Sequence, residues 1–201
     1  MSCSPCSTRP RAARPRPARR RVSSRFERVS SETEYDGAFF SVRRDVYRHE
    51  DGEDAEREIV SHTGAVGIVA LDGDRLWFVR QPREAIGAPD LLEIPAGKLD
   101  EEGEEPLETA KRELAEEIGK QAAEWEPLGS FYTSPGFSDE QVHLFLATGL
   151  SDVDERPEVH ENERIDVDVR PLAELEELIA TSTDSKTIIG LARLQARLAR
   201  R

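Results

Sequence analysis

Residues 91–120, LLEIPAGKLDEEGEEPLETAKRELAEEIGK, contain the pattern around which the chain is organised. A short apolar run ends at Pro95, an acidic loop follows, and the segment from Pro106 to Gly119 has helical spacing. Pro106 suits the first turn of a helix, where a missing N–H has no cost, and Gly119 suits a left-handed helix end. The stretch therefore predicts a strand, a loop and a helix in succession.

The predicted helix has an apolar side and an acidic side. Its apolar residues are Leu107, Ala110, Leu114 and Ile118. Glu113 and Glu117 are four residues apart and stand one turn apart, whereas Glu116 lies beside Arg112. Neighbouring carboxylates repel one another, and a hard divalent cation such as Mg²⁺ would hold them together. A solvated acidic face is the alternative. Glu108 and Arg112, with the acid first, predict a surface ion pair.

The residues around the acidic side resemble a known motif. RELAEEIG, from Arg112 to Gly119, resembles the core of the Nudix box, REUxEExG, in which U is aliphatic. Glu104 lies eight residues before Arg112, as the first glutamate of the box does. Gly97 departs from the pattern, because it precedes Glu104 by seven positions instead of six. The acidic loop is one residue longer than usual, which a surface loop absorbs without changing the helix register.

Further segments resemble the ADP-ribose pyrophosphatase branch of the Nudix hydrolases, from about residue 38 to residue 194. These segments are VRQPR at 79–83, LEIPAG at 92–97, SPGFSDE at 134–140 and ENE at 161–163. The resemblance implies hydrolysis of ADP-ribose to AMP and ribose 5-phosphate with Mg²⁺, or with Mn²⁺, as cofactor. It leaves open another nucleoside diphosphate derivative, such as a sugar nucleotide or NADH, and a regulator that binds a nucleotide without hydrolysing it.

The resemblance also assigns roles within the box. Glu113 and Glu117 are the expected principal Mg²⁺ ligands, and Glu116 is the expected ligand of a second ion, through which it takes part in catalysis. The backbone carbonyl of Ala96 is expected to join them, because the Pro-Ala-Gly break directs it away from the sheet. Gly97, Glu104 and Arg112 are expected to have structural roles, with Arg112 orienting the glutamates.

Other residues are candidates for the general base and for substrate contacts. A base must lie within hydrogen-bond reach of the attacking water, and glutamates already bound to metal are poorly suited to accept its proton. The resemblance points to a distal loop, with Glu161 as first choice and Glu140 as second; a solvated loop carboxylate is the alternative for each. The expected substrate-binding residues are Arg57 and Arg83 for phosphate and ribose, Glu93 for adenine or ribose, and Phe39 or Phe40 for stacking on adenine.

Composition and patterning divide the chain into three regions. We expect residues 1–25 to be a disordered Arg- and Pro-rich tail, residues 26–62 a small antiparallel sheet, and residues 63–201 the Nudix domain. The predicted fold class is α/β, an α/β/α sandwich with a mixed sheet. In the resembling enzymes the N-terminal sheet packs across a homodimer, which implies a homodimer here. The predicted strands of the domain are 64–71, 76–79, 91–94, 125–132, 141–147 and 165–169, followed by helices from Pro171 and from Asp184 or Ser185.

Charge and cysteine content limit the partners and the location. The net charge is −13, and residues 1–24 contain seven arginines and no acid, so the remainder is more acidic still. Such a surface repels nucleic acids and anionic lipids, and no apolar run is long enough to span a membrane. We expect a small nucleotide as the binding partner. Both cysteines lie in the tail, which favours a cytoplasmic protein, with organelle import by the Arg-rich N-terminus as a lesser alternative.

Overall fold

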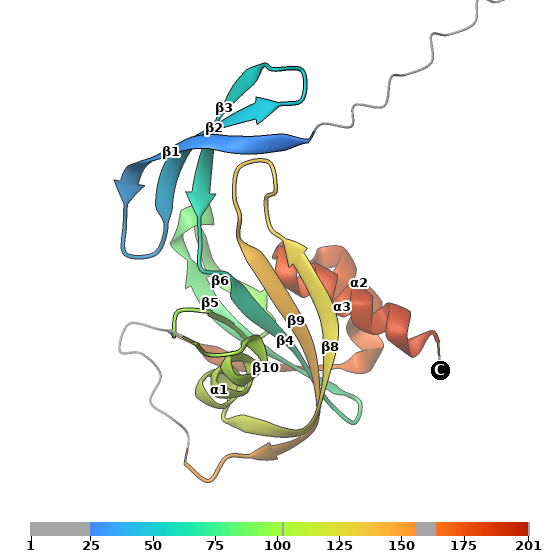
Figure 1. The fold of residues 1–201 in the computed structure, drawn as a ribbon. Coiled ribbons are helices and arrows are strands. Elements are labelled where there is room, and N and C mark those ends of the chain that lie inside the picture. Colours follow the sequence, from blue (N-terminus) through green and yellow to red (C-terminus); the bar gives the residue numbers. More distant parts are fainter. Residues whose placement is uncertain (1–24, 102, 156–163, 201) are drawn as a thin grey trace, which may run out of the picture.

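The computed structural model describes residues 25–101, 103–155 and 164–200. Figure 1 shows a small sheet at one end of the molecule and a larger sheet with helices on both sides. The larger sheet has seven strands and the small sheet has three. The predicted α/β fold with a mixed sheet and a separate N-terminal antiparallel sheet is therefore confirmed. Residues 1–24 of the predicted tail and the candidate base Glu161 lie outside the described residues.

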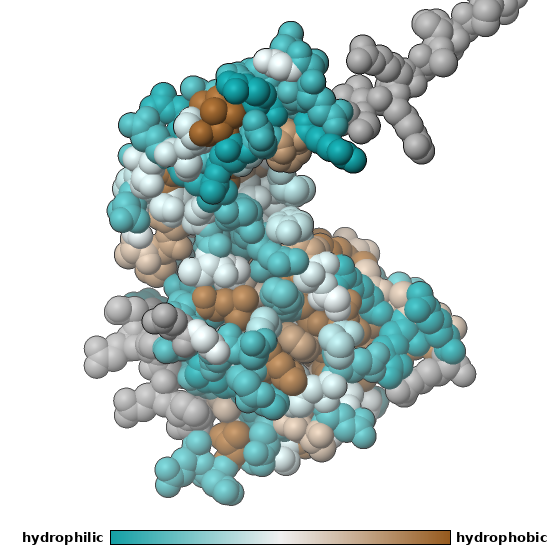
Figure 2. Space-filling view, in the orientation of Figure 1, coloured by the Kyte–Doolittle hydropathy of each residue, from teal (hydrophilic) through white to brown (hydrophobic). Residues whose placement is uncertain are grey.

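The small sheet consists of three antiparallel strands, β1 (Phe26–Asp36), β2 (Ser41–His49) and β3 (Asp54–Ser61). All eleven residues of β1 are exposed to solvent. Figure 2 shows that the visible surface of this sheet is mostly hydrophilic, with isolated hydrophobic patches. A three-stranded sheet with so little buried surface depends on another surface for its stability.

Two buried strands at the centre of the larger sheet pair in parallel. Its strands are β4 (Ala65–Asp72), β5 (Arg75–Arg83), β6 (Ala88–Glu93), β7 (Ala96–Lys98), β8 (Lys120–Tyr132), β9 (Gln141–Asp152) and β10 (Asp166–Pro171). The main order is β10-β5-β4-β9-β8, with β6 paired to β5 and β7 paired to β4. Only β4 and β9 pair in parallel among these described strands. The central strands are apolar on both faces because helices cover both faces.

Three α-helices cover the larger sheet. Helix α1 (Pro106–Ile118) packs against Val66, Ile68 and Ala70. Helices α2 (Leu175–Thr181) and α3 (Ser185–Leu198) pack against Val69 and against the side chains of β9 that lie on the same face of the sheet as Val69. Successive side chains of a strand point to opposite faces, so α1 lies on one side of the sheet and α3 on the other. The helix expected from Pro171 starts later, because Pro171 ends β10 and a 3₁₀ turn over Leu172–Glu174 comes first.

The loop between β8 and β9 joins the two sheets. The Val60 N–H donates to the Phe137 carbonyl (2.8 Å), and the Asp139 N–H donates to the Val60 carbonyl (3.2 Å). The Asp139 carboxylate accepts hydrogen bonds from the Arg43 guanidinium (2.9 Å), the Ser61 hydroxyl (3.1 Å) and the His62 N–H (3.0 Å). Burial alone would raise the pKa of Asp139, but these donors outweigh it and lower that pKa. The small sheet is thus held to the domain by backbone and charged contacts.

Candidate active site

Helix α1 forms at the predicted place and ends as predicted. Pro106 occupies the first helical position, and Gly119 has a φ of 66°, in the left-handed region. The Gly119 N–H donates to the Ala115 carbonyl, so the last turn is closed. Ala110, Leu114 and Ile118 are buried against the sheet, which fixes the rotation of the helix about its axis. That rotation directs the acidic side of the helix toward β7.

Gly97 lies in direct contact with Glu113. A Cβ atom added at Gly97 would lie 2.0 Å from the carboxyl carbon of Glu113, so a side chain at position 97 and the present position of Glu113 exclude each other. Gly97 is thus required for a close approach of backbone and carboxylate, which explains why the box has glycine there.

Glu117 approaches the same strand one turn further along the helix. Its side chain is almost entirely buried, and its Oε2 accepts a hydrogen bond of 2.8 Å from the Ala96 N–H. The ladder between β4 and β7 includes bonds from the Ile68 N–H to the Pro95 carbonyl and from the Leu99 N–H to the Gly64 carbonyl. Antiparallel strands alternate between bonded and non-bonded pairs, so the Ala96 N–H and C=O both point away from β4. The Ala96 carbonyl is therefore directed to the side where Glu117 lies.

Arg112 connects the acidic residues of the box. Its guanidinium donates to Glu113 (2.8 Å), Glu116 (3.1 Å) and Glu104 (3.3 Å). Burial alone would lower the pKa of Arg112, but the hydrogen bond to Glu104 and the charges of Glu113 and Glu116 raise it. Glu104 also accepts a hydrogen bond from the Thr109 hydroxyl (2.9 Å). The arrangement reduces the repulsion between the carboxylates and keeps them on one side of the helix.

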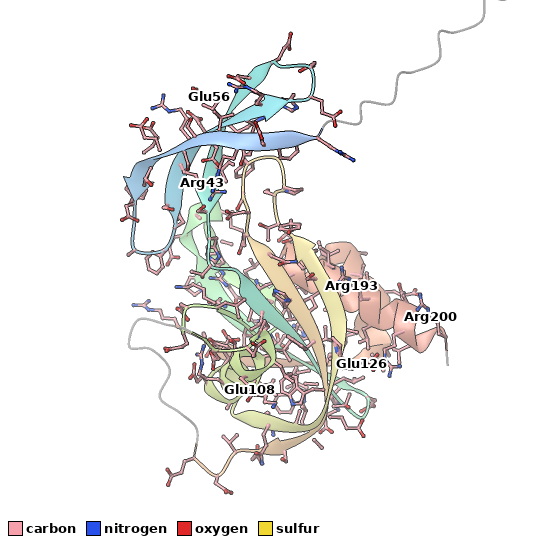
Figure 3. All side chains as sticks on the ribbon, viewed as in Figure 1. Arg43, Glu56, Glu108, Glu126, Arg193 and Arg200 are labelled. Carbon is pink, nitrogen blue, oxygen red and sulfur yellow. The ribbon has the colours of Figure 1, made fainter. Side chains whose placement is uncertain are left out.

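The predicted ion pair between Glu108 and Arg112 is wrong. Glu108 instead accepts a hydrogen bond from the Lys111 ammonium (2.7 Å), and Figure 3 shows Glu108 on α1. Arg112 has three carboxylates nearer the sheet, and partly buried charges attract more strongly than an exposed pair in water. The i,i+4 spacing was correct as a geometric rule, but tertiary contacts decided the partner.

The box residues line a cavity of about 560 Å³. The predicted site residues that line this cavity are Ala96, Gly97, Arg112, Glu113, Glu117, Arg83 and Glu140. Among the described residues neither Glu116 nor Glu104 lines the cavity, and Glu104 contacts the lining residue Arg112. Three of the four predicted metal ligands, Ala96, Glu113 and Glu117, therefore meet the candidate base Glu140 in one place, although they come from three separate segments of the chain.

Glu93 lies beneath this cavity and is fully buried. Its carboxylate accepts two hydrogen bonds from Arg83 (2.6 and 2.8 Å) and also contacts the Lys186 ammonium. Burial alone would raise the pKa of Glu93, but the hydrogen bond from Arg83 and the charge of Lys186 lower it. Arg83 and Lys186 both line the cavity, so Glu93 fixes their positions there. The predicted contact of Glu93 with adenine or ribose stays a prediction.

Glu140 has two polar neighbours in the cavity. The Thr133 hydroxyl donates to its Oε2 (2.7 Å), and His62 Nδ1 lies 3.9 Å from its Oε1. The Gly64 N–H donates to His62 Nδ1 (3.0 Å), so this nitrogen acts as a hydrogen-bond acceptor. Sequence reasoning missed His62, Thr133 and Lys186, since none belongs to a motif with a fixed spacing.

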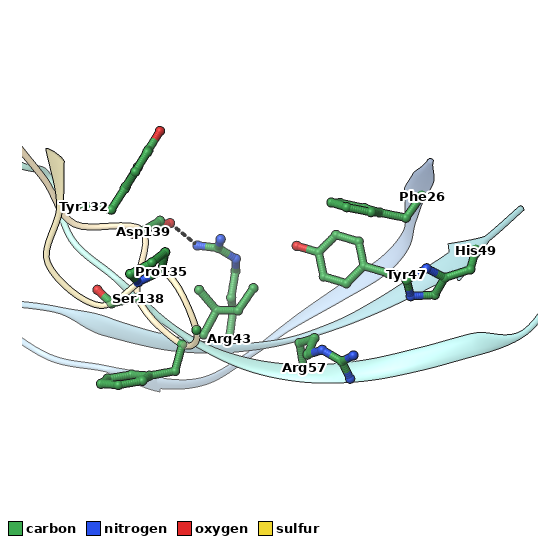
Figure 4. A pocket seen from close by; sticks show the side chains of 12 residues that line it. Phe26, Arg43, Tyr47, His49, Arg57, Tyr132, Pro135, Ser138 and Asp139 are labelled. Atoms are coloured by element: carbon green, nitrogen blue, oxygen red, sulfur yellow. Dashed lines mark hydrogen bonds and ion pairs between the residues drawn. The ribbon is translucent and has the colours of Figure 1, made fainter. Parts of the chain in front are cut away.

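Two predicted substrate-binding residues lie elsewhere. Arg57 lines a second cavity of about 470 Å³, between the small sheet and the β8–β9 loop. Figure 4 shows this cavity with Arg57 and Tyr47 on one side and Tyr132 on the other. Phe39 is 70% exposed, and the Lys98 ammonium lies 4.5 Å from the centre of its ring. Neither Arg57 nor Phe39 is among the described residues that line the box cavity.

The donor set fits a hard divalent cation. Glu113 and Glu117 converge on the backbone of β7, whose Ala96 carbonyl faces the same side. Carboxylate and carbonyl oxygens are the ligands that Mg²⁺ takes. In the described residues no group of three or more acidic, histidine or cysteine side chains is already arranged around one metal position. Arg112 and the Ala96 N–H engage these carboxylates instead.

Comparison with known proteins identifies the class first. The structure superposes on the crystal structure of an ADP compounds hydrolase with a TM-score of 0.76, covering 87% of this chain and 95% of that chain. The two sequences are 22% identical, so this likeness shows the shared α/β fold alone. The NUDIX domain family matches residues 61–189. The chain belongs to the NUDIX family, whose members typically use divalent metal ions.

Three relatives are more similar to this chain in sequence. The chain is 50% identical to the ADP-ribose pyrophosphatase of Mycobacterium tuberculosis over 69% of this chain and 66% of that protein, just under two thirds of its length. It is 43% identical to the ADP-ribose pyrophosphatase of Bacillus subtilis over 72% of this chain and 78% of that protein. It is also 39% identical to the methanol dehydrogenase activator of Bacillus methanolicus, over 85% of this chain and 94% of that protein.

Proposed function

We propose that the protein hydrolyses the pyrophosphate bond of ADP-ribose to AMP and ribose 5-phosphate, with Mg²⁺ or Mn²⁺ as cofactor. The observation that carries this proposal is the convergence of Glu113 and Glu117 on the backbone of Ala96 and Gly97, inside a cavity that also contains Arg83. The names of two relatives, at 50% and 43% identity, support ADP-ribose as the substrate.

Each residue of the site has a stated role in this proposal. Glu113, Glu117 and the Ala96 carbonyl would hold one cation, and Glu116 a second. When bound, these cations neutralise the diphosphate oxygens and make a bound water easier to deprotonate. Arg112 keeps the carboxylates on one side of the helix, and Arg83 contacts a phosphate. Each of these interactions places the diphosphate for attack without requiring a covalent bond to the protein.

The general base is a distal-loop glutamate. Glu161 remains the first candidate, and it lies outside the described residues. Glu140 lies in the cavity, where the Thr133 hydroxyl fixes one carboxylate oxygen and leaves the other on the side of His62. A carboxylate oriented in this way suits proton transfer from a water. Replacing Glu140 and Glu161 one at a time by glutamine separates them, because only loss of the base removes the acidic limb of the pH–rate profile.

A homodimer is part of the proposal. All eleven residues of β1 are exposed, and Val29 and Tyr35 are among the large apolar side chains that it leaves in water. Arg57 lies outside the lining of the box cavity of its own chain, so a partner subunit gives it a route to substrate. Light scattering after gel filtration measures the oligomeric state. A monomer at micromolar concentration would contradict this part of the proposal.

A second candidate function is regulation without hydrolysis. The relative with the broadest coverage among those described above is a methanol dehydrogenase activator, which is the observation that favours it. A sugar nucleotide or NADH remains the alternative substrate. No helix in the described residues is long and apolar enough to cross a membrane. The cytoplasmic location remains a prediction.

One assay separates these candidates. Purified protein is incubated with ADP-ribose, a sugar nucleotide or NADH in the presence of Mg²⁺, and the released mononucleotide is measured. We expect ADP-ribose to give the highest kcat/KM. Binding of ADP-ribose without release of AMP, with either Mg²⁺ or Mn²⁺, would favour the regulator. A higher kcat/KM for another compound in the panel would replace ADP-ribose as the substrate.

A further inference from the structure

The basic side chains that line the box cavity differ in how they are neutralised. Arg83 and Lys186 share the carboxylate of Glu93, and Arg112 is held by three glutamates. Lys98 also lines the cavity, yet among the described residues no carboxylate lies within 4 Å of its ammonium. Its described neighbour is the ring of Phe39, 4.5 Å away. Lys98 therefore has no ion-pair partner within 4 Å among the described residues, although Asp100 and Glu101 line the same cavity.

Lys98 approaches the cavity from the side opposite to the metal-ligand candidates. The Cβ position of Gly97 points at Glu113. Side chains alternate along a strand, so those of Ala96 and Lys98 in β7 point to the other face. The ammonium of Lys98 therefore does not compete with a metal ion for Glu113. A substrate held between the two sides would meet cations on one side and Lys98 on the other.

Phe39 is presented to Lys98 by a compact turn. The turn joins β1 to β2, and the Gly37 N–H donates to the Phe40 carbonyl (3.1 Å). A Cβ atom at Gly37 would lie 2.5 Å from the Tyr35 ring, whose centre is 5.8 Å from that of Phe40. These packed rings hold the turn closed with Phe39 at its tip. The small sheet thus reaches the box cavity of its own chain at Lys98.

We propose that Lys98 binds a phosphate oxygen of the substrate and that Phe39 is a positioning residue, which holds the ammonium at the mouth of the cavity. This inference rests on the proposed function, because it requires a diphosphate in the box cavity. A cation over an exposed aromatic ring contributes little energy, so the ammonium exchanges this contact for a phosphate at small cost. A charge-assisted hydrogen bond to phosphate is about twice as strong as a neutral one. Phe39 then acts on substrate through Lys98 and not by stacking on adenine.

The variant K98M tests the role of Lys98, since methionine keeps the length of the side chain and removes the charge. We expect KM for ADP-ribose to rise roughly tenfold with kcat within about twofold, because a uniform binding contact is lost. The Mg²⁺ concentration for half-maximal rate stays the same, which a metal-site residue would not allow. K98R restores most of the lost affinity. K111M is the matched control: Lys111 lies on α1 and pairs with Glu108, outside the cavity, and its KM is unchanged.

The variant F39L tests the positioning role. We expect KM to rise about threefold in the wild-type background and to change no further in the K98M background, because the two residues act through one contact. Additive effects would overturn the role of Phe39. A KM of K98M equal to that of wild type, or a loss confined to kcat, would overturn the role of Lys98. Failure of the wild-type protein to hydrolyse ADP-ribose would instead reject the proposed function, and the two failures are therefore distinguishable.

Discussion

The two sheets differ in where their stability comes from. The larger sheet has central strands whose apolar residues, such as Val66, Ile68 and Val69, are completely buried between helices. In the small sheet, β1 and β3 contain no fully buried residue, and the sheet is held to the domain through the β8–β9 loop. The buried core of the larger sheet therefore holds the box site in place. The small sheet, in contrast, depends on its contacts with the β8–β9 loop.

The largest expected effect is the loss of activity on substitution of Glu117, which lies on the helix that packs against the larger sheet. The variant E117Q keeps an acceptor for the Ala96 N–H, and so we expect the fold to remain intact. The Mg²⁺-dependent rate should fall about a thousandfold, because a neutral amide is a poor ligand for a hard cation. Turnover and circular dichroism are measured on the same sample. Retention of activity would show that the ligand assignment is wrong.

The next effect separates activity from stability at Gly97. In G97A the added methyl group meets the flexible end of Glu113, which can rotate away at small energetic cost. We expect the rate to fall about a hundredfold while the free energy of unfolding changes by less than about 1 kcal/mol. Denaturant unfolding and steady-state kinetics give the two values. A large loss of stability with full activity per folded molecule would contradict this explanation of the box glycine.

The small sheet should weaken selectively in acid. Burial alone would raise the pKa of Asp45, but hydrogen bonds from Ser31, Arg43 and Tyr47 outweigh it and lower that pKa to about 2. A carboxyl whose folded pKa is lowered stabilises the fold above its unfolded pKa of about 3.8 and loses that contribution as pH falls toward 2. The contribution is about 2 kcal/mol.

Hydrogen exchange of β1 and β2 between pH 5 and about pH 2.5 measures this loss, with β4 as the internal reference. The variant D45N should show weak protection of the small sheet already at pH 5 and little further change in acid. Equal loss of protection in both sheets as the pH falls would remove the contrast drawn above, because it would show that the two sheets unfold together.

The smallest effect is expected at the exposed pair on α1. In E108Q the hydrogen bond to Lys111 is weakened, and the free energy of unfolding should change by less than about 1 kcal/mol. The rate should stay within experimental error of wild type, since neither residue lines the cavity. Thermal unfolding at low and high salt measures the pair. A larger effect would indicate that surface charges of α1 also influence the carboxylates near Gly97.

The parts of the protein that were predictable from sequence are those that depend on local contacts. Pro106 and Gly119 marked the ends of α1, and the spacing of Glu113 and Glu117 indicated that they would stand one turn apart on the same side of the helix. Alternating residues near Val167 identified β10. These features follow from backbone geometry over a few residues, and the structure confirmed the helix and the strand. The fold class followed from the resemblance of the box and its neighbouring segments.

The parts that sequence did not predict depend on distant contacts. Nothing in the sequence near Glu93 indicated that Arg83 and Lys186 would converge on it, because Lys186 lies 93 residues away. The long strand β1 has no apolar alternation, since neither of its faces is buried in the described chain. The separation of Arg57 from the box cavity likewise appears only when the small sheet is placed on the β8–β9 loop.

Asp139 and Glu140 are joined by one peptide bond, yet they serve different parts of the molecule. Asp139 receives three donors from the region of the small sheet, and Glu140 faces the cavity beside the box helix. A shortened chain that begins after Ser61 would deprive Asp139 of Arg43 and Ser61, and the segment that bears Glu140 would lose two of its contacts. The N-terminal sheet is therefore not a detachable appendage, because trimming it would disturb the box cavity through the neighbouring residues Asp139 and Glu140.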